Sequence, residues 1–468
     1  MVPKTDSKRK LSSYEKFHYD RSRLNLHSCF YLGIELNELP EKRLICHALK
    51  ETIANHPQLH QTIAIDPEDN QPYIKNIDRV LKFDDVADYV PFAYTEDSIN
   101  QLFRDRKFPY CVEEPLWKLL ILENDKKCLL LLDHTLFDGM SALAFWKSFM
   151  KSLPDEAEES DDDLWAPSQE SSSQECHPYE RWPTTWGSVC KALLVGALFK
   201  LCPSAVLAVG RDQLRFKNYQ FPDGLFVDNG SIGRSRYHIR NDNCQQTLQI
   251  EPGRLRDLLS ACKRHGVSLT SFLAALLAIS MDKCLEQDCY TGSYLKIDVP
   301  MNTRKACAEV LNIPENSMTM GNYVAPTELR YNLRTTDDVW QTAKRLCKVL
   351  KSQTTTDVIS TINNVRLLDV ADTAKFIEEK LKAGGPSGTF EITNLGAQDF
   401  CRGSNDRFLV ENAVFNEPQS ISDVFTCSII STPLGGLSCC LSYPRAIKRS
   451  IEPCIDNLKE FLDQRRFI

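Results

Sequence analysis

The residues best suited to chemistry lie around His134. This histidine follows the apolar run Cys128–Asp133, and Asp138 and Gly139 follow it on a short loop. Histidine is a suitable general base because its unperturbed pKa of about 6.5 is close to neutrality. The chain has nine histidines, so the His-x-x-x-Asp spacing alone is a weak indication, and a structural histidine is the alternative. The position of His134 between a buried strand and a helix favours catalysis.

A base in this position fits the transfer of an acyl group from a thioester. A thioester is already activated, so the reaction needs a base for the incoming hydroxyl or amine and hydrogen-bond donors for the developing oxyanion. The sequence has no Gly-x-Ser-x-Gly elbow and no Cys-His signature that would predict an acyl-enzyme. We therefore expect direct transfer to the acceptor.

Two strands and a helix are expected to position His134. The runs Trp117–Leu122 and Cys128–Asp133 are apolar and joined by a turn, and the second fits a strand buried on both faces. Apolar residues at helical spacing predict a helix over Gly139–Leu153. Gly139 permits a tight, left-handed backbone at its start. Asp138 is placed to turn its carboxylate back and fix the loop.

Apolar periodicity predicts the remaining elements of an α/β chain. In the first half we expect a strand at Ser28–Ile34 and a helix at Glu41–Asn55. In the second half we expect the strand Gln246–Ile250, the helices Gly253–His265 and Leu269–Leu285, the strand Leu295–Val299, the helix Thr336–Gln353, the strands Thr389–Thr393, Phe408–Glu411, Phe425–Ile430 and Leu437–Ser442, and a closing helix with Ile451 and Leu462 on its inner face. The segment Ala274–Ile279 must be almost wholly buried.

Composition shifts divide the 468 residues into four parts, which agrees with a chain too long for one ordinary core. Residues 1–23 are expected to be a basic flexible arm, and residues 24–153 an N-terminal lobe that carries the histidine motif. Residues 154–212 combine an acidic run, prolines, serines and an apolar crossover segment, which predicts a linker. Residues 213–468 are expected to form the C-terminal lobe.

Charge and cysteine usage exclude several classes of protein. The net charge of −7 comes from seven acidic residues within Asp155–Asp163, and the rest of the chain is balanced, so no basic face for nucleic acid is expected. The 18 cysteines are spread along a long chain without Cys-x-x-Cys spacing. We therefore expect reduced thiols, no disulfide scaffold and no metal site.

Membrane contact is an open question in the sequence. The N-terminus has no apolar signal-peptide core, and no uncharged apolar run reaches the roughly 18 to 20 residues of a spanning helix. The segment Trp186–Gly210 is apolar but contains Lys191, Lys200 and Pro203. It fits either an element packed between the lobes or a helix in the plane of a membrane. We expect a cytosol-facing protein, peripheral on the endoplasmic reticulum or a lipid droplet if it binds a membrane.

The motifs together resemble the His-x-x-x-Asp acyl-CoA-dependent acyltransferases, which include plant BAHD enzymes, peptide-synthetase condensation domains, wax ester synthases and fungal alcohol acetyltransferases. The resemblance covers nearly the whole chain. It rests on His134–Gly139, His56-Pro57-Gln-Leu59, Glu114-Pro115-Leu-Trp117, Val267–Thr270, Asp298-Val-Pro300-Met-Asn-Thr-Arg304, Gly321-Asn322 and Thr393-Asn394-Leu-Gly396. The plant-type Asp-Phe-Gly-Trp-Gly motif does not occur, which favours the fungal alcohol acetyltransferase branch.

This resemblance implies an α/β fold of two similar lobes, each a mixed sheet with helices, with a channel between them as in chloramphenicol acetyltransferase and condensation domains. It implies that His134 is the base and that Asp138 is structural and pairs with Arg304 across the lobes. Asp133, in addition, either orients His134 or caps the strand end. The implied lining of the channel is Asp133, Asn322, Asn394 and Gly396.

The resemblance further implies a monomer that uses acetyl-CoA as acyl donor, without a metal. The acceptor would be the amine of a hydrophobic, sphingosine-like compound, and an alcohol that yields acetate esters is the alternative. A non-catalytic member that binds lipid or an acyl chain and a condensation-like domain are further alternatives. Against the last, condensation domains usually carry a second histidine at the position of Asp133.

Overall fold

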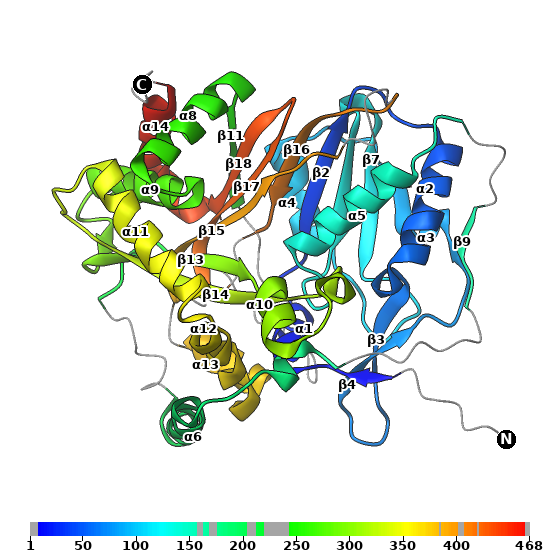
Figure 1. Cartoon of the computed structure of the whole chain (residues 1–468), viewed down its shortest axis with the longest axis horizontal. Coiled ribbons are helices and arrows are strands. Elements are labelled where there is room, and N and C mark those ends of the chain that lie inside the picture. Colours follow the sequence, from blue (N-terminus) through cyan, green and yellow to red (C-terminus); the bar gives the residue numbers. More distant parts are fainter. Residues whose placement is uncertain are drawn as a thin grey trace.

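A computed structural model describes residues 8–156, 162–167, 176–203, 212–219, 243–382, 385–400, 407–418 and 421–463. Two mixed sheets with helices lie side by side and form two lobes (Figure 1). The N-terminal lobe has a five-stranded sheet in the order β16-β2-β8-β7-β6, and the C-terminal lobe a six-stranded sheet in the order β11-β18-β17-β15-β13-β14. The predicted fold class is confirmed.

The N-terminal lobe is built around two strands that are apolar on both faces. One face of β7 and β8 packs on α2 and α5, and the opposite face packs on α4. The prediction of a doubly buried strand before His134 is therefore confirmed. The elements of this lobe are β2 (Phe30–Leu36), α2 (Lys42–Asn55), β3 (Gln61–Ile65), β4 (Pro72–Asn76), β5 (Leu81–Lys82), α3 (Phe83–Val86), β6 (Ala87–Tyr89), α4 (Glu96–Asp105), β7 (Trp117–Leu122), β8 (Lys127–Leu132) and α5 (Gly139–Ser152).

The C-terminal lobe packs its sheet against a nearly all-apolar helix, α9. Its segment Ser271–Met281 is buried without interruption, as the sequence predicted. The other elements are β10 (Arg215–Phe216), β11 (Asn243–Ile250), α8 (Pro252–His265), α9 (Leu269–Cys284), β12 (Tyr290–Thr291), β13 (Tyr294–Asn302), α10 (Arg304–Leu311), β14 (Val324–Asn332), α11 (Val339–Thr354), α12 (Val358–Val365), α13 (Thr373–Lys382), β15 (Gly388–Ala397), β17 (Asp423–Thr432), β18 (Gly436–Pro444) and α14 (Lys448–Asp463).

One strand crosses from the C-terminal half of the sequence into the N-terminal sheet. The strand β16 (Val410–Asn416) pairs antiparallel with β2 and also contacts β17 and β18 of the other sheet. Because a fifth strand from distant sequence extends the N-terminal sheet, the two lobes share backbone hydrogen bonds. The predicted assignment of residues 213–468 to the C-terminal lobe alone is wrong for this strand.

The basic N-terminal segment is folded over its described part. Arg9–Lys10 forms β1, which pairs with β4, and Ser13–Arg23 forms the helix α1. Ser12 and Glu15 form a capping box at the start of α1, and Arg9 forms an ion pair with Glu15 at 2.7 Å. The helix packs against α13 of the C-terminal lobe. The prediction of a flexible arm is therefore wrong from residue 8 onward, and residues 1–7 lie outside the described part.

The predicted linker also contains regular structure. Asp163–Trp165 forms β9, which pairs with β5, and Trp186–Leu201 forms the helix α6. Residues 157–161, 168–175 and 204–211 of that linker lie outside the described part.

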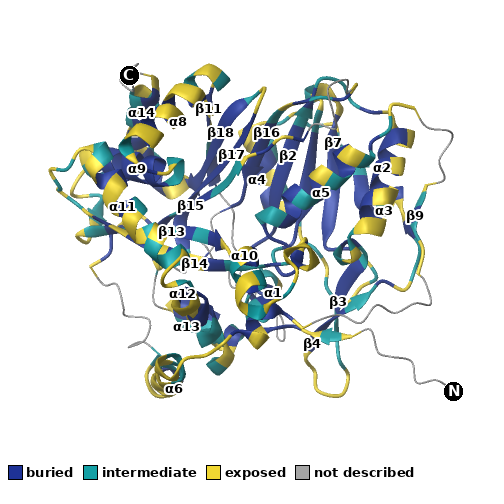
Figure 2. Cartoon of the chain, in the orientation of Figure 1, coloured by how far each residue is buried: buried dark blue, intermediate teal, exposed yellow. Residues whose placement is uncertain are grey.

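The helix α6 is apolar but mostly exposed, and it projects from the bottom of the molecule (Figures 1 and 2). Only Gly196 and Phe199 are buried, whereas Trp186 is 87% and Leu201 84% exposed. The helix is thus not packed between the lobes, which was one of the two alternatives for this segment. Among the described residues no single helix is long and apolar enough to cross a membrane; α8 and α9 reach the length only together, with a 94° bend between them.

Candidate active site

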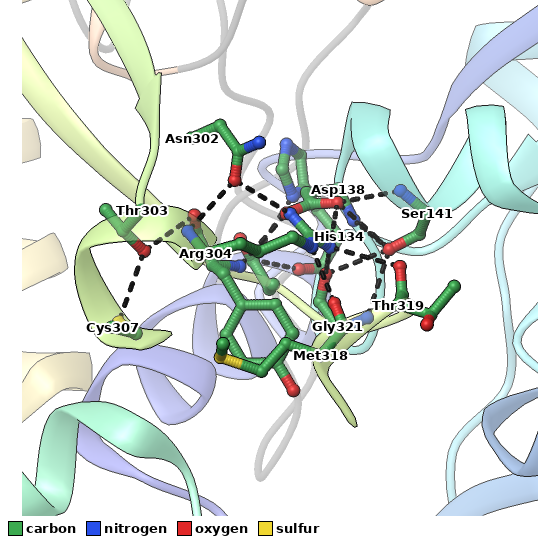
Figure 3. Close-up of polar contacts among 12 residues, drawn as sticks. His134, Asp138, Ser141, Asn302, Thr303, Arg304, Cys307, Met318, Thr319 and Gly321 are labelled. Carbon is green, nitrogen blue, oxygen red and sulfur yellow. Dashed lines mark hydrogen bonds and ion pairs between the residues drawn. The ribbon is translucent and has the colours of Figure 1, made fainter. Parts of the chain in front are cut away.

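His134 lies on the loop that joins β8 to α5, at the boundary between the lobes (Figure 3). The loop is short because Asp138 is already the N-cap of α5. The Asp138 carboxylate accepts hydrogen bonds from the backbone N–H and the hydroxyl of Ser141, both at 2.9 Å. The helix start therefore fixes the chain four residues after His134.

The second partner of Asp138 is Arg304 at the start of α10. The guanidinium donates two hydrogen bonds to the carboxylate, from Nη1 to Oδ2 at 2.8 Å and from Nη2 to Oδ1 at 2.9 Å. The side chains of Asp138 and Arg304 are only 1% and 5% exposed. The predicted ion pair across the lobes is confirmed, and its bidentate geometry is the stronger form of such a contact.

Hydrogen bonds leave the Asp138 carboxylate no role as a base. Burial alone would raise the pKa of Asp138. The charge and hydrogen bonds of Arg304, together with the N–H groups of Tyr323 and Ser141, outweigh this effect, so the pKa lies below its ordinary value. Arg304 in turn donates from Nε to the carbonyl of Met318 at 2.6 Å. The pair is a satisfied structural contact, as expected.

Gly321 and Asn322 lie just before β14 and hold the other side of the histidine loop. The amide nitrogen of Asn322 donates to the main-chain carbonyl of His134 at 2.6 Å and lies 3.3 Å from its Nδ1. The hydroxyl oxygen of Ser141 accepts a hydrogen bond from the backbone N–H of Gly321 at 3.1 Å. Asn322 thus positions His134 from the C-terminal lobe.

The imidazole of His134 is surrounded by aromatic rings. It stacks on His18 of α1 with ring centroids 4.8 Å apart, and Phe30 and His27 lie at 4.9 and 5.8 Å. Burial, and after it the positive charge of Arg21, lower the pKa of His134 to about 3. The ring is therefore neutral at neutral pH, which is the form that a general base needs.

His134 opens into a cavity of about 270 Å³ between the lobes. The cavity wall combines apolar side chains with an unusual number of carboxyl groups. It is lined by Tyr14, Phe17, His18, Arg21, Phe30, His134, Asp138, Gly139, Met140, Asp298, Pro300, Asn302, Val324, Pro326, Glu391, Thr393, Asn394, Leu395, Phe415, Glu417, Ser422 and Asp423. A second cavity lies beside α5 and Arg304, and Met140 lines both. Two cavities that share Met140 in their walls fit the channel that we expect between the lobes.

Of the four residues predicted to line the channel, one lines the cavity and three do not. Asn394 lines the cavity, and its amide donates to the hydroxyl of Thr270 at 3.1 Å. Asp133 does not line it: the carboxylate is turned into the loop, where it accepts hydrogen bonds from Tyr110 and the N–H of Thr135. Asn322 and Gly396 are also absent from the wall. Gly396 has φ +77° and lies at an irregularity in the pairing of β15 with β17.

Gly139 has a different role from the predicted one. It is the first residue of α5 and is not among the described residues with positive φ. A Cβ at this position would lie 2.7 Å from Cδ2 of Leu395. The glycine therefore permits the close approach of Leu395 to the helix start. The prediction of a left-handed backbone at Gly139 is wrong.

Sequence reasoning missed half of the cavity wall. His18 and Arg21 come from the segment predicted to be a flexible arm, although the Ser12-x-x-Glu15 capping box signals a helix start there. Glu391, Glu417 and Asp423 stand in or beside strands whose patterns carry no sign of a site.

Comparison with known proteins identifies the family of this chain. The sequence matches the alcohol acetyltransferase family over residues 10–465. It is 39% identical over 464 residues to the N-acetyltransferase SLI1 of Saccharomyces cerevisiae, covering 97% of this chain and 99% of that protein. The chain belongs to the alcohol acetyltransferase family, and it is an acetyltransferase, for which the family implies acetyl-CoA as donor.

Solved structures share the fold at low sequence identity. The trichothecene 15-O-acetyltransferase TRI3 from Fusarium sporotrichioides aligns with a TM-score of 0.65 and 11% identity, over 97% of this chain and 95% of that chain. The peptide-synthetase condensation enzyme VibH aligns with a TM-score of 0.55 and 11% identity, with the same coverage.

The first prediction concerns the ion pair between the lobes. Replacing Asp138→Asn should lower the free energy of unfolding by about 3–5 kcal/mol, because Arg304 then stays buried without its counter-charge. The neighbouring exposed pair Lys305–Glu309 supplies the control, and Glu309→Gln should cost less than about 1 kcal/mol. Urea unfolding curves measure both losses, and equal losses in the two variants would contradict the prediction.

The same ion pair makes stability depend on pH. The pKa of Asp138 lies below its unfolded value, so its stabilisation is present above about pH 4 and is lost as pH falls through the folded pKa.

Proposed function

We propose that this protein transfers the acetyl group of acetyl-CoA to the amine of a hydrophobic, long-chain (sphingosine-like) compound, with His134 as general base. The observation that carries the proposal is the neutral imidazole of His134 in a cavity between the lobes. The similarity to a protein named as an N-acetyltransferase supports an amine as acceptor. Apolar side chains of the cavity, such as Phe30 and Phe415, fit a hydrophobic acceptor.

In the proposed reaction the acceptor nitrogen attacks the thioester carbonyl while His134 takes the proton that the nitrogen loses. The tetrahedral intermediate then collapses, the carbon–sulfur bond breaks, and the protonated imidazole returns its proton to the CoA thiolate. The products are the amide and CoA, and His134 ends in its neutral form. Asp138, Arg304 and Asn322 contribute by holding the histidine loop, so they are positioning residues.

Replacing His134→Ala should lower kcat by about a hundredfold to ten-thousandfold, because the attacking nitrogen then has no positioned proton acceptor. CoA release, followed with a thiol reagent on purified protein, measures this loss. The control is His47→Ala on the exposed face of α2, which should keep wild-type activity. Full turnover by a correctly folded His134→Ala variant would refute the role of this residue.

The choice between amine and alcohol is tested with the same release of CoA. With acetyl-CoA as donor, sphingosine should give CoA release and a medium-chain alcohol should give none. Release with the alcohol alone would favour the alternative, an alcohol O-acetyltransferase that forms acetate esters. No release with either acceptor would favour a non-catalytic member that binds lipid.

We propose further that the protein meets its hydrophobic acceptor at a membrane surface, through α6. The helix carries no acidic residue, and its exposed side chains include Trp186, Leu194 and Leu201. The helix also lies close to the cavity. Phe376 of α13 contacts Phe199 of α6, with ring centroids 5.9 Å apart, and the cavity-lining Phe17 of α1 at 6.2 Å.

Replacing Leu194 and Leu201 together by glutamate should abolish binding to vesicles of phosphatidylcholine and phosphatidylserine, because charged side chains do not enter the apolar region of a bilayer. Co-sedimentation measures binding. The control is Leu434→Glu in the turn between β17 and β18, an exposed leucine far from α6 in sequence, which should leave binding unchanged. Equal binding of all three proteins, or no binding by the wild type, would refute the proposal for α6.

A further inference from the structure

Besides Asp138, four carboxyl groups line the same cavity as His134. Asp298 and Glu391 are directly aligned on the adjacent parallel strands β13 and β15, Asp423 begins β17, and Glu417 follows β16. Asp423 and Glu417 are only 3% and 9% exposed. Such groups are costly to bury as anions, so their concentration on one wall needs an explanation.

The carboxyl groups interact with each other in two pairs. Glu391 and Glu417 lie close enough to shift each other's pKa, and so do Asp298 and Asp423. Burial, followed by the charges of Glu417 and Asp423, raises the pKa of Glu391 well above its ordinary value. Burial and the charge of Asp298 do the same to the pKa of Asp423. In each pair, burial and the neighbouring negative charge therefore favour the protonated form of a carboxyl group.

Three cations are packed around these groups. Lys296 is 3.4 Å from Asp298 but also 3.2 Å from Glu328, on the far side of β13 from the β15 strand. Lys380 donates to the hydroxyl of Ser422 at 3.4 Å, and burial lowers its pKa to about 8. Arg21 is the cation that lines the cavity itself, and its charge acts on Glu417.

A second, independent feature also indicates a polar ligand in this cavity. His18 lines it and is 6% exposed, and neither of its ring nitrogens has a hydrogen-bond partner among the described residues. Buried polar groups in proteins are nearly always satisfied, so an unpaired imidazole beside the base marks a place where a substrate supplies the partner.

We propose that the carboxyl groups of Asp298, Glu391, Glu417 and Asp423 bind the acceptor as its ammonium ion and accept the first proton that it must lose. This inference rests on the proposed N-acetylation and adds the recognition of the acceptor. An aliphatic amine is almost fully protonated near neutrality and is not a nucleophile in that form, whereas an alcohol arrives neutral. An amine therefore needs two proton acceptors in the cavity, and an alcohol needs only His134.

The proton balance of this step closes without any further reactant. The ammonium group transfers one proton to a carboxylate of the wall, which gives a neutral amine and a carboxylic acid. A raised pKa makes these carboxylates better proton acceptors than ordinary ones. The amine then attacks the thioester while His134 takes the second proton and passes it to the leaving thiolate. The carboxylic acid returns its proton to solvent after the amide leaves.

The test compares an amine and an alcohol of the same chain length. Glu391→Gln and Glu417→Gln keep the size of the side chain but remove its charge. Each should raise the KM for dodecylamine by about tenfold or more, since a hydrogen bond to a charged group is lost, and leave the KM for acetyl-CoA unchanged. Inhibition by dodecyltrimethylammonium, a cation that cannot be acetylated, should weaken to a similar extent. The control is Glu411→Gln, an exposed position near the start of β16, whose other end leads to Glu417.

A merely structural role would lower the melting temperature of the variants and would not separate the KM for dodecylamine from that for acetyl-CoA. Folded variants with an unchanged KM for dodecylamine would overturn the ammonium site and leave N-acetylation standing. Acetylation of dodecanol in place of dodecylamine by the wild type would instead overturn the proposed function.

The wild-type protein gives a check that does not depend on the folding of variants. The trimethylammonium group does not titrate, so any change in its affinity with pH reports the protein. Calorimetry below the micelle concentration should show weaker binding of dodecyltrimethylammonium as pH falls and the wall carboxylates take up protons, with a midpoint above the usual value of about 4. Affinity independent of pH down to this value would overturn the proposal.

Discussion

The carboxylate of Asp138 is the point at which the two lobes and the histidine loop are held together. One side chain caps α5, accepts the backbone N–H of Tyr323 at 3.0 Å and forms the bidentate pair with Arg304. Each of these partners comes from a different stretch of sequence, so a shift of either lobe would leave a charge buried without its partner. The position of His134 relative to the C-terminal wall of the cavity depends on this contact, because the loop between His134 and Asp138 has little freedom.

Two exchanged segments make the arrangement more rigid than a single ion pair could. The strand β16 brings Phe415 and the following Glu417 from the C-terminal half into the sheet of the N-terminal lobe. The helix α1 carries the N-terminal residues His18 and Arg21 back against α13. Each lobe thus supplies part of the other's side of the cavity. A catalytic base needs this stability, since a small displacement from the attacking nitrogen is costly to the rate.

The sequence predicted the parts of the site that local patterns encode. The apolar runs of β7 and β8, the role of Asp138 in fixing the loop and its pairing with Arg304 were all recognisable, the last through the family pattern. His18, Glu391 and Glu417 were not, because their roles arise only when distant segments meet. A glutamate that alternates with apolar residues in a strand is expected to face solvent, and only the second lobe turns that face into a cavity wall. The helix α1 was hidden because its many charged residues outweigh its weak apolar periodicity.

Burial acts in the same direction on the base and on the carboxyl groups, and this gives the cavity its chemical character. A low-dielectric wall disfavours charge, so it lowers the pKa of His134 and raises the pKa of Glu391 and Asp423. The cavity therefore reduces its charge by keeping His134 neutral and by favouring the protonated form of its carboxyl groups. A cationic acceptor reverses this balance, because its charge favours the ionised carboxylates without protonating His134. In the proposed reaction, the cavity is close to neutral again once the ammonium group has given up its proton, and His134 is still free to act as the base.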